Sequence, residues 1–103
     1  MSATNVQQIL LIAKPLTYYS PLDEDAFFAW LQSIPCVTTV RGVGPELEIS
    51  IDVARLDEDG LRELIALFFR YGMDMKGLAQ FANDGNRHWF LRKDMYWYEH
   101  VFV

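Results

Sequence analysis

The chain has 103 residues, a length typical of one domain, and we expect residues 1–103 to form a single domain. Hydrophobic residues make up 51% of the sequence and aromatic residues 15%, which is enough apolar side chain to form a core and excludes wholesale disorder. The formal net charge is −5, and the negative charge is concentrated in residues 23–60, which hold nine acidic and two basic side chains.

The acidic balance narrows the classes of partner. Nucleic-acid binding needs a basic stripe, which this chain lacks, so we expect no direct contact with nucleic acid and favour a basic protein partner. Cys36 is alone, which excludes an intramolecular disulfide and indicates a reducing compartment. The apolar run 9–13 is far shorter than the roughly 20 residues of a membrane span. We therefore expect no membrane association and a cytoplasmic location.

The first elements predicted along the chain are a strand and a helix. Residues 6–13 are β-prone and nearly continuously apolar in their C-terminal half, which is typical of a strand covered on both faces or lying in mid-sheet. Ser20 is the expected N-cap of the helix, with Pro21 at its first position and Asp23 three residues after the cap. Pro35 stops this helix. Its inward positions, at helical spacing, are Phe27, Trp30, Leu31 and Ile34.

Two strands joined by a glycine-rich turn follow. Residues 36–41 and 46–53 predict a β-hairpin whose turn is 42–45. The second strand alternates, so that one face is expected to pack against helices and the other to meet water or a partner. The inward residues are Leu47, Ile49, Ile51 and Val53, and the outward ones are Glu46, Glu48, Ser50 and Asp52.

Further helices are predicted in the second half. Asp57 can cap a helix that ends near Gly72, and its apolar positions repeat at helical spacing at Leu61, Leu64, Ile65, Phe68 and Phe69. Asp74 can cap a short third helix that ends at the turn 83–85. The aromatic-rich residues 89–103 leave three structures open: a short helix, a strand or a docked irregular tail.

Motifs for catalysis or cofactor binding are weak. The glycines of the turn 42–45 lack the third glycine and the following helix of a phosphate-binding loop. His88 and His100 have acidic neighbours but no recognised metal-ligand spacing, and Cys36 lacks a catalytic neighbourhood. We therefore expect no catalytic residue, no metal, no cofactor and no enzymatic activity. An enzyme that uses His88 or His100 is the least favoured alternative.

Acidic side chains are the main candidates for partner binding. Two groups lie at expected helix starts, where the helix dipole alone would explain them: Asp23, Glu24 and Asp25, and Asp57, Glu58 and Asp59. The alternative is that the two groups lie near one another and merge with Glu46, Glu48 and Asp52 into one negative surface that steers a basic partner. The topology decides between these interpretations.

The C-terminal aromatic side chains also allow two interpretations. Core closure by Trp89, Phe90, Trp97 and Phe102 is expected, because so small a domain needs large side chains to bury enough area. If Tyr96 and Tyr98 are exposed, they are instead candidates for a protein-binding hot spot.

Residues 61–103 carry a distinctive string of residues. It comprises Leu67-Phe68-Phe69-Arg70-Tyr71, Asp74-Met75, Leu78, Phe81, Asn83, Asn86, Trp89-Phe90, Tyr96-Trp97-Tyr98 and Val101-Phe102. This string resembles small bacterial toxin-immunity proteins of the contact-dependent growth inhibition (polymorphic toxin) type. The resemblance implies a cytoplasmic, non-enzymatic protein that neutralises a cognate toxin domain by binding it, and it implies no particular binding residues.

The elements together predict an α+β fold in the order β-α-β-β-α-α, with a small antiparallel or mixed sheet and helices on one face. Parallel pairing of the first strand through the crossover helix is one option. The leading hypothesis is an immunity protein that binds a cognate toxin, expected to be a basic nuclease domain, through the acidic surface. The alternative is a small non-enzymatic regulatory or assembly module that self-associates or binds a partner helix through exposed aromatic side chains. The oligomeric state is left open.

Overall fold

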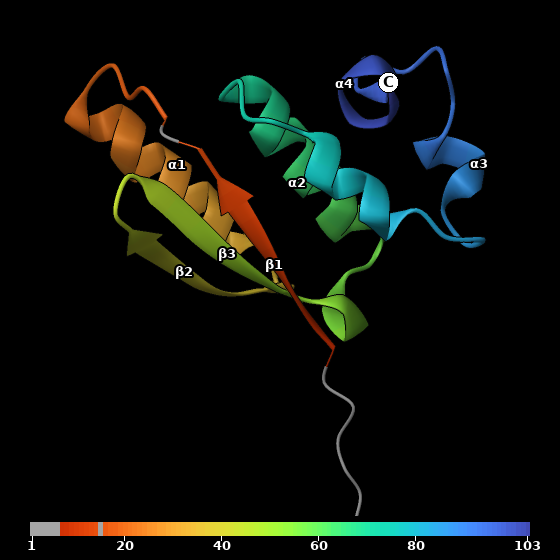
Figure 1. Cartoon of the computed structure of the whole chain (residues 1–103), viewed down its shortest axis with the longest axis horizontal. Coiled ribbons are helices and arrows are strands. Elements are labelled where there is room, and N and C mark those ends of the chain that lie inside the picture. The colour runs from red at the N-terminus through yellow and green to blue at the C-terminus, as the bar shows by residue number, and fades with distance from the viewer. Residues whose placement is uncertain (1–6, 15) are drawn as a thin grey trace, which may run out of the picture.

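The computed structural model in Figure 1 describes residues 7–14 and 16–103, so the expected strand residue Val6 lies outside the described residues. The fold is of the α+β class, with a three-stranded antiparallel sheet. The elements are β1 (Gln8–Ala13), α1 (Pro21–Ser33), β2 (Val37–Val43), β3 (Glu46–Asp52), the 3₁₀ helix η1 (Val53–Arg55), α2 (Glu58–Arg70), the 3₁₀ helix η2 (Lys76–Phe81), α3 (Arg87–Phe90) and α4 (Tyr98–Phe102).

The strand order is β1-β3-β2, and β3 runs antiparallel to both neighbours. The parallel pairing considered for the first strand is therefore wrong. β1 and β2 do run in the same direction on either side of the α1 crossover, but β3 folds back from the hairpin between them and pairs with both (Figure 1). A β-bulge interrupts β2 between Val37 and Thr39.

The two faces of the sheet differ as the alternation in the second hairpin strand predicts. Ile49 and Ile51 are fully buried on the inner face with Leu11, which pairs with Ile49. The prediction that the first strand is covered on both faces or lies in mid-sheet is wrong. β1 is an edge strand, and its outward side chains Leu10 and Ile12 are 50% and 45% exposed.

Side-chain hydrogen bonds cap the N-terminal ends of both long helices, α1 and α2, at the predicted residues. The Ser20 hydroxyl oxygen accepts from the Asp23 N–H (3.1 Å), and the Asp23 carboxylate accepts from the Tyr19 N–H (3.0 Å). The Asp57 carboxylate accepts from the Gly60 N–H (2.8 Å) at the start of α2. Because these signals act within one turn of helix, the sequence was sufficient to predict them.

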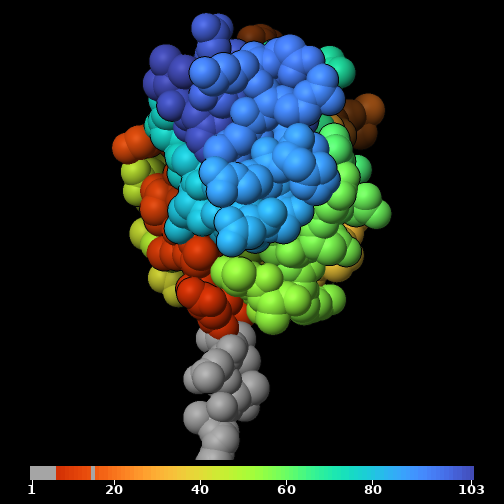
Figure 2. All heavy atoms as spheres, turned by 90° about the vertical axis from the view of Figure 1, so that its right-hand side faces the viewer, coloured from red at the N-terminus to blue at the C-terminus, as the bar shows by residue number. Residues whose placement is uncertain are grey.

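The C-terminal third differs from the predicted third helix. η2 is a 3₁₀ helix, and the Asp74 carboxylate accepts from the Lys76 N–H (3.0 Å), so it supports a turn before η2. The last residues form the short helices α3 and α4, with Trp89, Phe90 and Trp97 buried as expected for core closure. In Figure 1, α2 lies between α1 and the sheet on one side and α3 and α4 on the other; Figure 2 shows the face that the C-terminal segments form.

Candidate partner-binding surfaces

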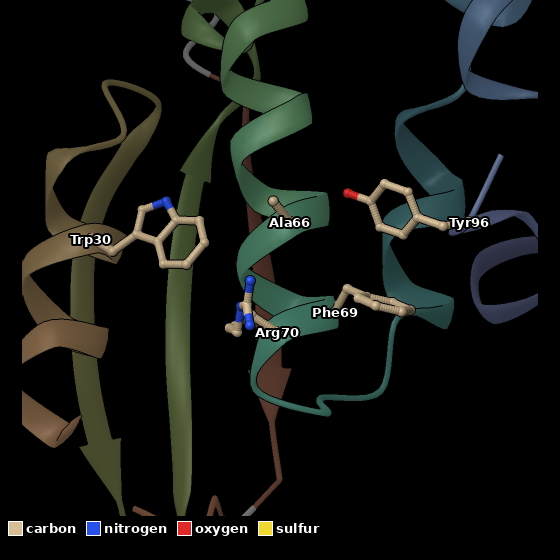
Figure 3. Close-up of a pocket in the computed structure, with 5 residues that line it drawn as sticks. All are labelled: Trp30, Ala66, Phe69, Arg70 and Tyr96. Atoms are coloured by element: carbon tan, nitrogen blue, oxygen red, sulfur yellow. The ribbon is translucent and has the colours of Figure 1, made fainter.

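A hollow of about 400 Å³ lies on the exposed side of α2, and we call it the aromatic groove (Figure 3). Its lining residues are Trp30, Ala66, Phe69, Arg70 and Tyr96. Trp30 belongs to α1, Tyr96 to the segment between α3 and α4, and the other three to α2. Segments far apart in sequence therefore meet at one surface.

The spacing of residues in α2 places this groove. Leu64, Leu67 and Phe68 are buried, whereas Ala66, Phe69 and Arg70 follow one another at i, i+3 and i+4 on the opposite side. Phe69 belongs to the predicted apolar repeat of this helix, but it is 44% exposed, unlike the buried Leu61, Leu64, Ile65 and Phe68. Ala66 has the smallest side chain of the lining, so the hollow opens above it between larger neighbours.

One wall of the groove is aromatic. The Phe69 and Tyr96 rings pack edge to face with centroids 4.8 Å apart, and the Tyr96 ring packs in the same way against buried Trp97 at 5.0 Å. Tyr96 is thus held by the core although its side chain is 49% exposed. Partial burial raises the pKa of the Tyr96 hydroxyl, with a smaller opposing effect from Arg62 and a smaller raising effect from Glu63. Like any phenol, the Tyr96 hydroxyl can donate a hydrogen bond to a partner.

The opposite wall is the Trp30 indole. Its Nε1–H donates to Glu63 Oε1 at 2.9 Å, which connects α1 to α2 and fixes the ring beside the groove. The inward position predicted for Trp30 is only partly correct, because its side chain is half-buried at the junction between the helices. An indole N–H needs an acceptor, and this requirement was the one sequence signal that Trp30 reaches a polar edge.

A second hollow, of about 480 Å³, adjoins the groove at Arg70. Its lining residues are Leu16, Thr17, Tyr19, Asp23, Arg70, Tyr71 and Gly72. Arg70 is exposed, and within residues 7–14 and 16–103 no carboxylate lies within ion-pair distance of it. The groove therefore has a cation at one end.

The two acidic helix starts lie at opposite ends of α2. The Tyr71 hydroxyl donates to the Asp23 carbonyl oxygen at 3.5 Å, which places the start of α1 beside the C-terminal end of α2. Asp57 caps the N-terminal end, and the 13 residues of α2 span about 20 Å at about 1.5 Å per residue. The two acidic groups therefore do not lie next to one another, because α1 and α2 run antiparallel.

Most of the candidate carboxylates have local partners. Asp23, Asp52 and Asp57 accept backbone N–H groups, while Glu46, Glu48 and Glu58 form ion pairs with Lys14 (3.7 Å), Arg41 (3.8 Å) and Arg62 (2.9 Å). In the described part of the chain, Glu24, Asp25 and Asp59 have no side-chain hydrogen bond or ion pair. Glu24 and Glu46 line one hollow of about 320 Å³, so the first acidic group does approach the end of the sheet.

The remaining candidate residues differ in accessibility. Tyr98 is half-buried and packs on Phe102 at a centroid distance of 5.4 Å, so Tyr96 is the more accessible of the two tyrosines. Cys36 is fully buried, and burial raises the pKa of its thiol. His100 is exposed and packs edge to face on Phe69 at 5.3 Å.

Across residues 7–14 and 16–103 no group of three or more His, Cys, Asp or Glu side chains could hold a metal ion. No helix in these same ranges is both long and apolar enough to cross a membrane. Comparison with protein-family models, curated proteins and solved structures finds no match to the chain.

Proposed function

We propose that the protein is a non-enzymatic cytoplasmic immunity protein that binds and neutralises a cognate toxin, with the aromatic groove at the centre of its binding surface. The observation that carries the proposal is the exposure of Phe69 and Tyr96 (44% and 49%) in a hollow opposite Trp30. Aromatic side chains held rigidly in a hollow are typical centres of protein-protein interfaces, because they bury much area at little entropic cost.

The charge distribution supports a basic partner such as a nuclease domain. The net charge is −5, and the carboxylates without local partners, Glu24, Asp25 and Asp59, lie at the first turns of the two helices that border the groove. Charges in such positions accelerate the encounter with a basic surface more than they tighten the final complex. We therefore assign steering to these carboxylates and affinity to the groove.

The same geometry supports a second candidate function. Ala66, Phe69 and Arg70 line the groove along the axis of α2, and a hollow with aromatic walls on a helix surface also fits an amphipathic partner helix. A regulatory or assembly module that binds such a helix is the alternative. The identity of the bound protein distinguishes the two functions.

The proposal is tested with two substitutions that replace a helical alanine by uncharged glutamine, one inside the groove and one outside it as a control. Ala66→Gln fills the floor of the groove, and Ala29→Gln places the same side chain on the exposed surface of α1, outside the groove lining. Tagged wild-type protein captures its partner from host lysate, the partner is identified by mass spectrometry, and affinities are then measured with the purified partner. We expect a basic toxin whose activity is lost on binding, with affinity at least about tenfold weaker for Ala66→Gln only.

Two results would contradict parts of this proposal. Equal affinity for both variants would remove the groove from the interface. A partner without toxic activity would support the regulatory alternative. Lysine at Asp25 or Asp59 should slow association at low salt with little change in dissociation.

A further inference from the structure

The free edge of β1 is a second surface with specific chemistry. The Val53 N–H donates to the Gln7 carbonyl oxygen at 3.0 Å, which continues the register in which Gln8 pairs with Asp52. In an antiparallel pair, alternate residues exchange hydrogen bonds with the neighbouring strand. Odd-numbered residues of β1 therefore bond to β3, and the N–H and C=O groups of Gln8, Leu10 and Ile12 point away from it. Within the described ranges no backbone hydrogen bond from another element reaches these groups.

The two edges of the sheet are protected unequally. Folded proteins block sheet edges with charges, prolines or bulges, since an open edge templates pairing with another strand. β2 has both Arg41 and a bulge between Val37 and Thr39. β1, with the sequence QILLIA, contains no charge and no proline, and its pairing with β3 is regular over six residues. The β1 edge thus lacks the charge and the bulge that protect the β2 edge.

Side chains on the outer face favour the same conclusion. Leu10 and Ile12 project from β1 with 50% and 45% of their surface exposed. These residues also carry the free backbone groups at the edge. A strand paired there would satisfy those groups and cover part of both side chains. Figure 2 shows β1 reaching the surface beside the segment that contains η2.

The charge of the chain indicates which molecule pairs with the edge of β1. Residues 1–22 contain Lys14 and no acidic side chain, although the whole chain has a net charge of −5. On the outer face Glu48 and Asp52 of β3 flank β1, but β1 itself carries no charge, so two copies paired along it bring no like charges together on the paired strands. An uncharged strand is also complementary to itself in antiparallel orientation, which is the arrangement that a two-fold axis produces.

We propose that a second copy of the chain pairs its β1 antiparallel with β1 of the first, forming a six-stranded sheet in the order β2-β3-β1-β1-β3-β2. Main-chain hydrogen bonds from Gln8, Leu10 and Ile12 join the copies, and the four Leu10 and Ile12 side chains share the outer face. The residues that line the aromatic groove belong to α1, α2 and the segment between α3 and α4, and none of them belongs to β1.

The experiment combines light scattering after size exclusion with amide hydrogen exchange by NMR, both over a range of protein concentrations. Wild-type protein should change from the 12.0 kDa monomer to a species of twice that mass. The amides of Gln8, Leu10 and Ile12 should gain protection as the dimer forms. Leu10→Lys and Ile12→Lys bring like charges together at the axis and should abolish both effects. Thr39→Lys, on the exposed part of the other edge strand, should leave both intact.

Three outcomes would overturn the proposal. Wild-type protein that stays monomeric at all concentrations excludes the dimer. A dimer that survives Leu10→Lys and Ile12→Lys uses another surface, as does one that Tyr96→Ala abolishes while the β1 amides stay unprotected. Circular dichroism of each lysine variant separates loss of pairing from loss of folding, because the substituted side chains are exposed and should leave the spectrum unchanged.

Discussion

The tryptophans Trp97 and Trp30 donate hydrogen bonds of similar length in opposite environments. Trp97 is 2% exposed, and its Nε1–H donates to the Phe90 carbonyl oxygen at 2.8 Å in the core. Trp30 donates to Glu63 at 2.9 Å at the edge of the aromatic groove, where water can replace either partner. A buried polar group that loses its partner costs more free energy than an exposed one, because nothing replaces the lost hydrogen bond.

Phenylalanine at each position tests this difference. Trp97→Phe should lower the free energy of unfolding by about 1 to 3 kcal/mol through the unpaired carbonyl, with a further loss from the smaller ring. Trp30→Phe should lower it by less than about 1 kcal/mol, since its bond is exposed. Urea denaturation of both variants measures the comparison, and equal losses would show that the buried bond contributes nothing specific.

At the residue scale, the sequence predicts correctly those contacts that a side chain makes with residues close to it in the chain. The hydroxyl of Ser20 and the carboxylate of Asp57 bond within three residues, so their spacing alone determines the cap. Trp30 and Phe69 fit the apolar repeats of their helices. Helical spacing shows which side of a helix is apolar, but it does not show how wide a strip of that side is buried. The actual exposure of Trp30 and Phe69 depends on where α1 and Tyr96 lie against α2, and these contacts join distant parts of the chain.

At the scale of elements, the end of α2 determines where the C-terminal third of the chain begins. Gly72 has a φ angle of 67°. Its N–H donates to the Phe69 carbonyl oxygen at 3.2 Å, and the Met73 N–H donates to the Phe68 carbonyl oxygen at 2.9 Å. This pair of bonds is a Schellman motif, and it reverses the chain so that Met73 enters the core. The left-handed conformation makes glycine the favoured residue at this position.

Alanine at two glycines separates backbone strain from crowding. A Cβ at Gly72 or at Gly42 would meet no atom within 4 Å, but only Gly72 of the two has positive φ. Gly72→Ala should therefore lower the free energy of unfolding by about 1 to 2 kcal/mol, and Gly42→Ala, in β2, should have almost no effect or stabilise slightly. Thermal or urea denaturation measures both, and a neutral Gly72→Ala would mean that α2 does not need a left-handed residue at position 72 to end.

At the scale of the whole molecule, the α+β class and the hairpin of β2 with β3 were predictable, and the place of β1 in the sheet was not. Alternation in 46–53 identified the buried Ile49 and Ile51, because that pattern reflects one open and one covered face. The same reasoning misplaced β1, since a continuous apolar run looks alike in a central strand and in an edge strand with an open outer face. The antiparallel order of α1 and α2 likewise separated the two acidic groups, which one of the two interpretations had placed near one another.

Because the thiol of Cys36 is buried, the free energy of unfolding of the whole protein should decrease as the pH rises into the alkaline range. Burial raises the pKa of this thiol, and burial raises the pKa of Tyr18 and Tyr71 in the same direction. As pH rises past the ordinary thiol pKa of about 8.5, the unfolded chain releases a proton that the folded chain keeps. The unfolded state then binds fewer protons, so the free energy of unfolding falls with pH. The stability is complete below that pKa and is lost as pH rises through the folded value.

Cys36→Ala should remove the decrease in the free energy of unfolding that begins as the pH rises past the ordinary thiol pKa. Between pH of about 8 and about 10, the wild-type free energy of unfolding should fall with a slope of up to about 1.4 kcal/mol per pH unit from this one group. The variant should be less stable at neutral pH, because it loses the packing of the sulfur, yet its slope over this range should be shallower. The tyrosines should restore similar slopes only at higher pH, because the ordinary tyrosine pKa is about 10. Urea denaturation at a series of pH values gives both slopes, and identical slopes would mean that the thiol ionises as readily in the folded protein as in the unfolded chain.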